Sequence, residues 1–156
     1  HKVAVVDGRI AAFLLAMRED APYLNDNYAW FAARFPQFIY VDRIVVSSEF
    51  AGLKIGSQLY VDLFDYARSQ GIKAITCEYN VRPPNPASQR FHDKFGFQEL
   101  GQQWVAHGTK LVSLQEGKRK VKFVTLTKTG NYSVKVKYVG NQNFKGSSST
   151  DAFTVG

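Results

Sequence analysis

The 156 residues are 45% hydrophobic and 14% aromatic, a composition that supports a packed core and excludes a wholly disordered chain. No apolar run approaches the ~20 residues that a membrane helix needs, so we expect no membrane partner. The single cysteine, Cys77, excludes an internal disulfide, and with the three histidines it shows no ligand spacing, so no metal site is predicted.

The net charge of +7 is concentrated at the end of the chain. Residues 1–116 carry 12 basic and 12 acidic residues, whereas residues 117–156 carry eight basic residues and the acid Asp151. No stacking or groove-reading motif accompanies the basic run Lys118–Lys120, which indicates a solvated linker and no nucleic-acid partner. The asymmetry predicts two regions, a balanced one over 1–116 and a basic tail over 117–156.

The first half of the chain has the pattern of an α/β unit. Hydrophobic periodicity and turn residues predict strands over 2–6 and 9–16, a helix over 26–35, a strand over 38–46, a helix over 55–70 and a strand over 74–79. The order strand, loop, helix, strand favours a parallel pair of strands joined by a crossover helix.

The second half begins with a strong helix start. Asn85 followed by Pro86 is typical of a capped first turn, and the helix should end at Gly96. Strands are predicted over 97–103 and 109–115, and in the tail over 121–126, 131–138 and 151–155. The 40 residues of the tail make a marginal core by themselves.

The segment from Tyr40 to Ser57 has the features of an anion site. A strand leads into a glycine-containing loop that opens an amphipathic helix, where unpaired amide groups and the helix dipole favour negative charge. Gly56 allows close approach of the backbone, and Lys54 adds a cation. The alternative is an ordinary strand–helix turn that uses glycine for its geometry alone.

Two motifs resemble the GNAT acetyltransferase family over residues 1–115. Asn85, Phe91-His92 and Gly96-Phe97 match its second signature in type and spacing. The loop resembles the family's acetyl-CoA loop, usually Arg/Gln-x-x-Gly-x-Gly/Ala, and retains Gly52 and Gly56. Ala51 stands where Arg or Gln is usual, and Lys54 stands where the middle glycine is usual.

The resemblance implies an α/β fold, with a mixed central sheet, splayed parallel strands and flanking helices. The strand-like pattern of the tail adds a short all-β appendage to this fold. It implies acetyl-CoA as co-substrate and no metal. The residues expected to contact it are Ile44, Val45, Val46, Ala51, Gly52, Leu53, Lys54, Ile55, Gly56, Ser57 and Asn85, the last of which also suits a helix cap. The chain begins at the family's second strand, so the first strand and helices are expected to be missing, which would remove part of the acceptor site and put activity in doubt.

The implied reaction is direct attack of an amine on the acetyl thioester, which makes the protein an N-acetyltransferase. Glu78 and Asp42, from the two splayed strands, are the candidate bases, and a salt bridge is the alternative for Asp42. Tyr40 lies where many relatives carry a catalytic Glu, and it would orient water or substrate. His92 is the candidate acid for the departing thiolate, and a helix histidine bonded to a backbone carbonyl is the alternative.

Several other residues have a structural interpretation. Cys77 is expected to be a buried apolar residue instead of a nucleophile. The aromatic residues between 23 and 38 are expected to form core, and an acceptor-pocket role for Tyr28 or Trp30 is the alternative.

The tail resembles the last strands of Ig-like repeats in microbial surface adhesins, at about half their length. It should therefore pack on the body or pair its edge with another chain, which would give a homo-oligomer. A chimera of two fragments is the corresponding hypothesis. The rival functions are an inactive acyl-CoA binder and a surface fusion protein with a passenger acetyltransferase. The resemblances imply a cytoplasmic body and an extracellular type of tail, and they leave the acceptor amine, whether small molecule or peptide, open.

Overall fold

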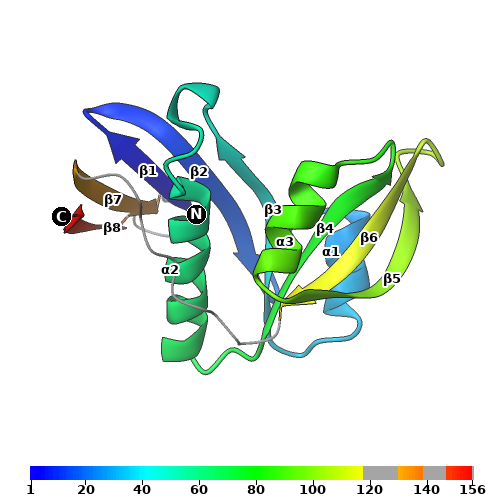
Figure 1. The fold of residues 1–156 in the computed structure, drawn as a ribbon. Helices are drawn as coiled ribbons and strands as arrows, with labels where there is room; N and C mark the ends of the chain where they lie inside the picture. Colours follow the sequence, from blue (N-terminus) through cyan, green and yellow to red (C-terminus); the bar gives the residue numbers. More distant parts are fainter. Residues whose placement is uncertain (118–129, 139–146, 156) are drawn as a thin grey trace. The chain divides into compact units, whose positions relative to one another are not determined.

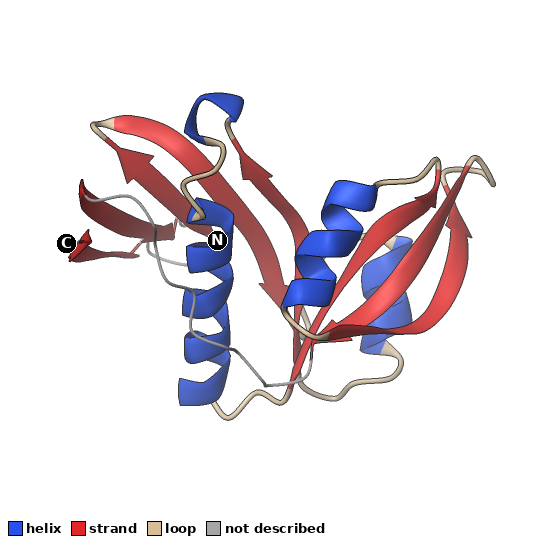
Figure 2. Cartoon of the chain, viewed as in Figure 1, coloured by secondary structure: helices blue, strands red, loops and turns tan. Residues whose placement is uncertain are grey.

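A computed structural model describes residues 1–117, 130–138 and 147–155 of the chain. Over these residues the fold is a mixed α/β structure, as expected (Figures 1 and 2). The elements in chain order are β1 (Lys2–Val6), β2 (Arg9–Arg18), α1 (Asp26–Ala32), β3 (Phe38–Val46), the 3-10 helix η1 (Ser48–Phe50), α2 (Ile55–Ser69), β4 (Ala74–Arg82), α3 (Pro86–Lys94), β5 (Phe97–Val105), β6 (Lys110–Gly117), β7 (Gly130–Tyr138) and β8 (Ser147–Val155).

The element boundaries differ from the sequence predictions mainly where pairing extends a strand. β4 continues to Arg82, three residues beyond the predicted end, because Asn80 and Arg82 pair with β6. β8 begins at Ser147, since it pairs with β7 along its whole length. The strand predicted over 121–126 lies outside the described residues.

The chain divides into two compact units, and the divisions fall inside β2, β3 and α2. Unit 1 comprises residues 1–16 and 43–63 with the C-terminal strands, and unit 2 comprises 17–42 and 64–122. The predicted division between residues 116 and 117 stays a prediction. Among the described residues, no helix has the length and hydropathy needed to cross a membrane.

Unit 2 contains a mixed sheet in the order β5-β6-β4-β3. β3 and β4 run parallel, and their register covers Phe38–Val41 with Ala74–Cys77, the first four residues of each strand. β4 then continues in antiparallel pairing with β6 as far as Arg82. The parallel pair is therefore hydrogen-bonded at one end only, as expected for the splayed strands, and we call the point after Val41 and Cys77 the fork.

Two helices of unit 2 cover opposite faces of this sheet (Figure 1). α1 contributes Tyr28 and Phe31 to a buried cluster with Tyr40 and with Leu114 of β6. α3 lies against the other face, where its His92 contacts Tyr79 of β4 and Phe97 of β5. Because side chains alternate along a strand, successive residues of β4 point to α1 and to α3 in turn.

Aromatic packing fills the α1 face, as the sequence predicted. Phe31 and Phe38 are fully buried, and Tyr28 is 6% exposed. Met17, Ala21, Tyr23, Trp30, Phe35 and Val105 pack around this cluster. The Tyr28 hydroxyl accepts from the Ala21 N–H and donates to the Arg18 carbonyl, both at 2.9 Å, so its role is structural.

Unit 1 contains an antiparallel sheet in the order β2-β1-β7-β8. β7 pairs with β1 through Val3↔Lys135, Ala4↔Val134 and Val5↔Ser133. Of the two arrangements expected for the tail, packing on the body is the one observed. In the same unit, Lys2 of β1 forms an ion pair with Asp62 of α2.

Candidate functional site

Two carboxylates lie directly after the fork of unit 2. Val41 and Cys77 form the last pair in the parallel register. Asp42 follows Val41 on β3, and Glu78 follows Cys77 on β4. Tyr40 and Thr76 are aligned two residues earlier, so strand alternation puts Tyr40, Asp42 and Glu78 on the same face of the sheet. The structure thus brings both predicted bases together on the α1 face.

Glu78 is held by a phenol. The Tyr40 hydroxyl donates to Glu78 Oε1 at 3.0 Å, and the Tyr40 side chain is fully buried. Burial, followed by the negative charge of Glu78, raises the pKa of Tyr40 well above its ordinary value. The phenol therefore stays protonated and acts as a permanent hydrogen-bond donor to the carboxylate.

Asp42 has a phenol partner of its own. The Tyr23 hydroxyl donates to Asp42 Oδ1 at 2.6 Å, within the usual range for an O–H···O⁻ bond. Tyr23 lies in the loop before α1, and the sequence alternative for Asp42, a salt bridge, stays a prediction. Asp42 and Glu78 are both half-buried as residues, and Oε2 of Glu78 is itself buried.

The loop into α2 has the backbone conformation of an anion site. Gly52 has φ +83°, and Lys54 has φ 59°, so the left-handed conformation expected at the family's middle glycine is present with a lysine in its place. The Lys54 carbonyl accepts from the Gln58 N–H at 3.0 Å and thereby opens α2. A non-glycine residue in this conformation costs about 1 kcal/mol.

The loop residues fit a diphosphate group. The N–H groups of Ile55, Gly56 and Ser57 lie in the first turn of α2, where the helix supplies no acceptors for them. Gly56 and Ser57 are buried, and Gly56 has no Cβ to obstruct a ligand. The helix dipole favours a negative group at this end of α2.

The end of β3 is open to solvent. Val45 and Val46 are 42% and 37% exposed, whereas Ile44 is half-buried. These are the residues predicted to contact a pantetheine chain, and an exposed apolar strand end suits that type of ligand. They belong to unit 1, as does the loop into α2.

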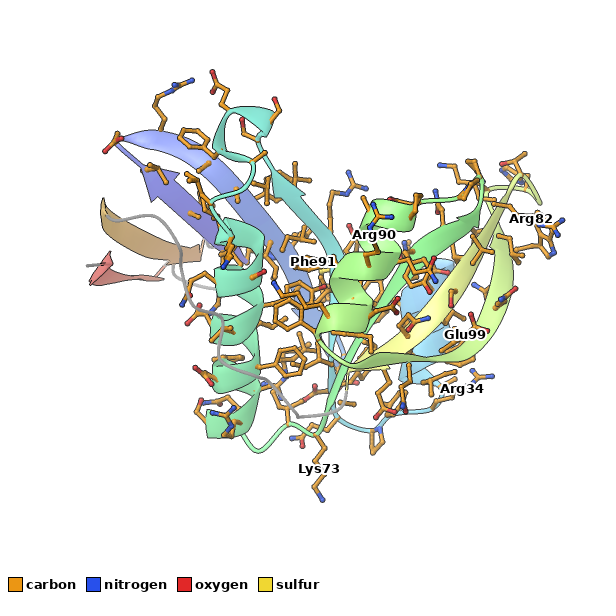
Figure 3. All side chains as sticks on the ribbon, viewed as in Figure 1. Arg34, Lys73, Arg82, Arg90, Phe91 and Glu99 are labelled. Atoms are coloured by element: carbon orange, nitrogen blue, oxygen red, sulfur yellow. The ribbon has the colours of Figure 1, made fainter. Side chains whose placement is uncertain are left out.

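Asn85 caps α3, as one of its two interpretations predicted. Its side-chain oxygen accepts from the Ser88 N–H at 3.1 Å, and Pro86 occupies the first turn. Asn85 is exposed, which leaves its amide accessible to a ligand. The exposed guanidinium groups of Arg82, at the end of β4, and Arg90, on α3, also belong to unit 2 (Figure 3).

His92 lies on the α3 face of the sheet, opposite to the two carboxylates. It is 3% exposed, and its Nδ1 is 2.8 Å from the Ser88 carbonyl oxygen, so Nδ1 carries the proton that it donates there. Burial lowers the pKa of His92 below its ordinary value. These contacts are those of the alternative interpretation, a helix histidine bonded to a backbone carbonyl.

Cys77 is a buried residue, as predicted. It is 1% exposed, and burial together with Glu78 raises the pKa of its thiol well above the ordinary value. Among the described residues, there is no group of three or more His, Cys, Asp or Glu that could hold a metal ion.

Sequence reasoning missed two participants in the carboxylate site. Tyr23 was assigned to the core, and Asn25 was not singled out. Asn25 caps α1, since its Oδ1 accepts from the Asn27 and Tyr28 N–H groups at 2.9 and 3.0 Å. An Asn directly before Asp26 is a recognisable cap pattern, but nothing in the local sequence connects either residue to a carboxylate on β3 or β4.

A sequence model of the acetyltransferase (GNAT) family matches residues 1–97. The chain belongs to this family. No curated protein matches the chain.

Solved structures of acetyltransferases share the fold. Naa20 of Chaetomium thermophilum in complex with a bisubstrate analogue is 15% identical, with a TM-score of 0.61 over 74% of this chain and 64% of that one. A putative streptothricin acetyltransferase of Bacillus anthracis in complex with acetyl coenzyme A is 16% identical, with a TM-score of 0.58 over 76% and 61%. The ribosomal-protein-S18-alanine N-acetyltransferase of Escherichia coli is 14% identical, with a TM-score of 0.53 over 79% and 74%.

This GNAT chain therefore spans less than two thirds of two of those relatives. The family model ends at residue 97, before the basic tail. Nothing found here supports the Ig-like resemblance of the tail or its origin in a chimera, and both stay predictions.

Proposed function

We propose that the protein transfers the acetyl group of acetyl-CoA to an amine, with Glu78 as the general base. The observation that carries this proposal is the pair of half-buried carboxylates after the fork, each bonded to a tyrosine. Membership of the GNAT family supports acetyl-CoA as the donor. The relatives that act on peptide or protein amines support an amine acceptor, so peptide N-terminal amines belong among the first candidates.

The loop residues would hold the coenzyme. Backbone N–H groups of Gly52–Ser57 would bind the diphosphate, with Lys54 as the accompanying cation. Ile44–Val46 and Asn85 would contact the pantetheine arm, and backbone N–H groups of that strand segment would stabilise the oxyanion. The bound thioester supplies the electrophilic carbonyl.

An alkylammonium ion has a reference pKa of about 10.4, so the acceptor amine is protonated at neutral pH. Glu78 would take this proton. The neutral nitrogen then forms the N–C bond, the C–S bond breaks, and the thiolate leaves with the electron pair. The nitrogen loses its second proton to water, and the thiolate takes a proton from water. The net change converts the ammonium ion and acetyl-CoA into the amide, CoASH and one proton, which Glu78 passes to water.

We choose Glu78 over Asp42 because Glu78 projects from β4, which stays paired to β6 along the rest of its length. Asp42 lies on the same face and would bind the acceptor's ammonium group. His92 has no acid role in this proposal, because a buried imidazole with a lowered pKa is neutral at pH 7. Water protonates the thiolate instead.

The test combines binding with turnover. Calorimetric titration of coenzyme A and acetyl-CoA into the full chain measures the coenzyme site, and release of CoASH in the presence of an amine panel measures the reaction. Micromolar binding with turnover supports the proposal. Binding without turnover of any amine identifies an inactive acyl-CoA binder, and absence of binding to the folded chain favours a passenger role for the acetyltransferase body.

A further inference from the structure

The buried phenol of Tyr40 faces two acceptors with one proton. Its hydroxyl lies 3.0 Å from Glu78 Oε1 and 3.4 Å from Asn25 Oδ1. Asn25 Oδ1 already accepts from two backbone N–H groups at the start of α1, those of Asn27 and Tyr28. Both lone pairs of Asn25 Oδ1 are thereby occupied. The Tyr40 hydroxyl therefore donates its proton to Glu78, which is the nearer acceptor and is charged.

The ring that carries this hydroxyl is held from three sides. Tyr28 contacts it edge-on with ring centroids 5.7 Å apart, Phe31 packs at 5.9 Å, and Tyr23 packs at 6.3 Å. Tyr40 is fully buried, so rotation of its ring would need rearrangement of the α1 face. The position of the donor is therefore fixed by the core and not by the carboxylate.

The chemistry of Tyr40 also suits a permanent donor. Burial and the charges of Glu78 and Asp42 oppose ionisation of the phenol, so the pKa of Tyr40 is raised. The hydroxyl consequently donates throughout the pH range in which an enzyme works. A residue that stays protonated does not itself take a proton from an amine.

Resting on the proposed function, we propose that Tyr40 is the positioning residue of the general base. Its phenol fixes Glu78 in one orientation after the fork and keeps the carboxylate ionised, so that Glu78 is ready to accept a proton. The hydrogen bond matters because a second carboxylate, Asp42, lies on the same face and disfavours ionisation of Glu78. Without the donor, Glu78 would be protonated at higher pH.

Five segments contribute described groups around Glu78. β3 supplies Tyr40 and Asp42, the loop before α1 supplies Tyr23, and the α1 cap supplies Asn25. On β4 itself, Cys77 precedes Glu78, with its thiol kept neutral by burial. On β6 the residue paired with Glu78 is the apolar Leu114. Tyr23 makes the same type of bond to Asp42, which provides a matched control within the site.

The experiment compares Tyr40→Phe and Tyr23→Phe with the wild-type chain, each checked for folding by circular dichroism. Each substitution removes one hydroxyl and keeps the ring in place. Carbon-13 NMR of glutamate-labelled protein follows the titration of the Glu78 carboxyl, assigned with a Glu78→Gln sample. The pH dependence of kcat/KM for amine acetylation is measured in parallel.

We expect the Glu78 titration to move up by about one to two pH units in Tyr40→Phe, because a hydrogen bond to a charged group stabilises that form. The acid limb of the kcat/KM profile should move to higher pH by the same amount. At a given pH on that limb, kcat/KM should fall tenfold or more, and at high pH it should return to the wild-type value. Tyr23→Phe should not move the Glu78 titration upward, since its hydroxyl bonds to Asp42.

The outcomes separate the two proposals. An unchanged Glu78 titration in Tyr40→Phe overturns the positioning role, whether or not the protein is active. A shifted titration with an unshifted rate profile, or with no activity at all, upholds the contact between Tyr40 and Glu78 but overturns Glu78 as the base. A loss of rate that is equal at every pH would indicate a structural defect and would also overturn the inference.

Discussion

The loop into α2 and the carboxylate pair after the fork are built in different ways. The loop is one continuous segment, and its chemistry comes from backbone N–H groups whose direction is set by the conformations of Gly52 and Lys54. The carboxylate pair depends on side chains from the loop before α1, from β3 and from β4. A backbone site should therefore fail when an added side chain occupies the place of the anion, whereas a side-chain site should fail when a functional group is removed.

The largest expected effect is at Glu78. Glu78→Gln removes the proposed base while keeping its size, and kcat/KM for amine acetylation should fall by about 10²- to 10⁴-fold. Coenzyme A affinity, measured by calorimetry, should change little. Asp42→Asn is the matched control on the same face, and a larger loss from Asp42→Asn than from Glu78→Gln would exchange the roles of the two carboxylates.

The loop should respond to an added carboxylate. Gly56→Glu places negative charge in the first turn of α2, and the affinity for coenzyme A should fall by about a hundredfold, because like charges in contact cost several kcal/mol. The control is Gly52→Ala, at a position where an added Cβ meets open space within 4 Å. That variant should lose about 1 kcal/mol of stability from its φ of +83° but retain the larger part of its binding. Equal binding by wild type and Gly56→Glu would exclude the diphosphate from this loop.

His92 should make the free energy of unfolding depend on pH. Its folded pKa is lowered, so the unfolded chain binds more protons between that pKa and about 6.5, and stability falls as the pH drops through this window. The slope from one proton is at most about 1.4 kcal/mol per pH unit. His92→Gln should remove this part of the acid sensitivity in urea unfolding at pH 7 and 5.5. A wild-type slope in His92→Gln would contradict the assignment.

Substitutions of Lys54 should have the smallest effect of those considered. They separate the contribution of the backbone conformation at position 54 from that of the lysine charge. Lys54→Gly and Lys54→Ala both remove the cation, but glycine alone relieves the left-handed conformation. Lys54→Gly should be more stable than Lys54→Ala by about 0.4–1 kcal/mol in denaturant unfolding. The two variants should bind coenzyme A equally, since they share the same loss of charge. Unequal binding would show that the loop conformation itself changes.

The sequence predicted the elements of residues 1–117 because each depends on local patterns. The helix over 55–69 follows from an apolar stripe, and Asn85-Pro86 defines the start of α3. Lys54 was also recognised as a residue in a glycine position. Local patterns carried no information about β4 beyond residue 79, since that extension depends on pairing with β6.

The sequence singled out Glu78, Asp42 and Tyr40, but not the hydrogen bonds that Tyr40 and Tyr23 donate to the two carboxylates. Glu78 and Asp42 could be chosen because the family resemblance places them on the two splayed strands. For Asp42 there is also the cost of an unpaired carboxylate among apolar strand residues. Tyr23 and Tyr40 are aromatic residues in an aromatic-rich segment, and the sequence does not distinguish a phenol that only packs from one that also bonds a carboxylate. That distinction depends on the register between β3 and β4.

The pairing of β1 with β7 has a consequence for the order in which the chain folds. β7 pairs with β8, the next strand along the sequence, whereas the pairing of Val3 with Lys135 joins residues that are 132 positions apart. Pairings between residues so distant in sequence are slow to form, because a large loss of chain entropy precedes any gain from contacts. During synthesis β1 emerges well before its partner strand β7, so the outer edge of β1 is uncovered until β7 has been made. A nascent chain with such an edge is vulnerable to pairing with its neighbours, and a chaperone that shields β1 should raise the yield of folded protein.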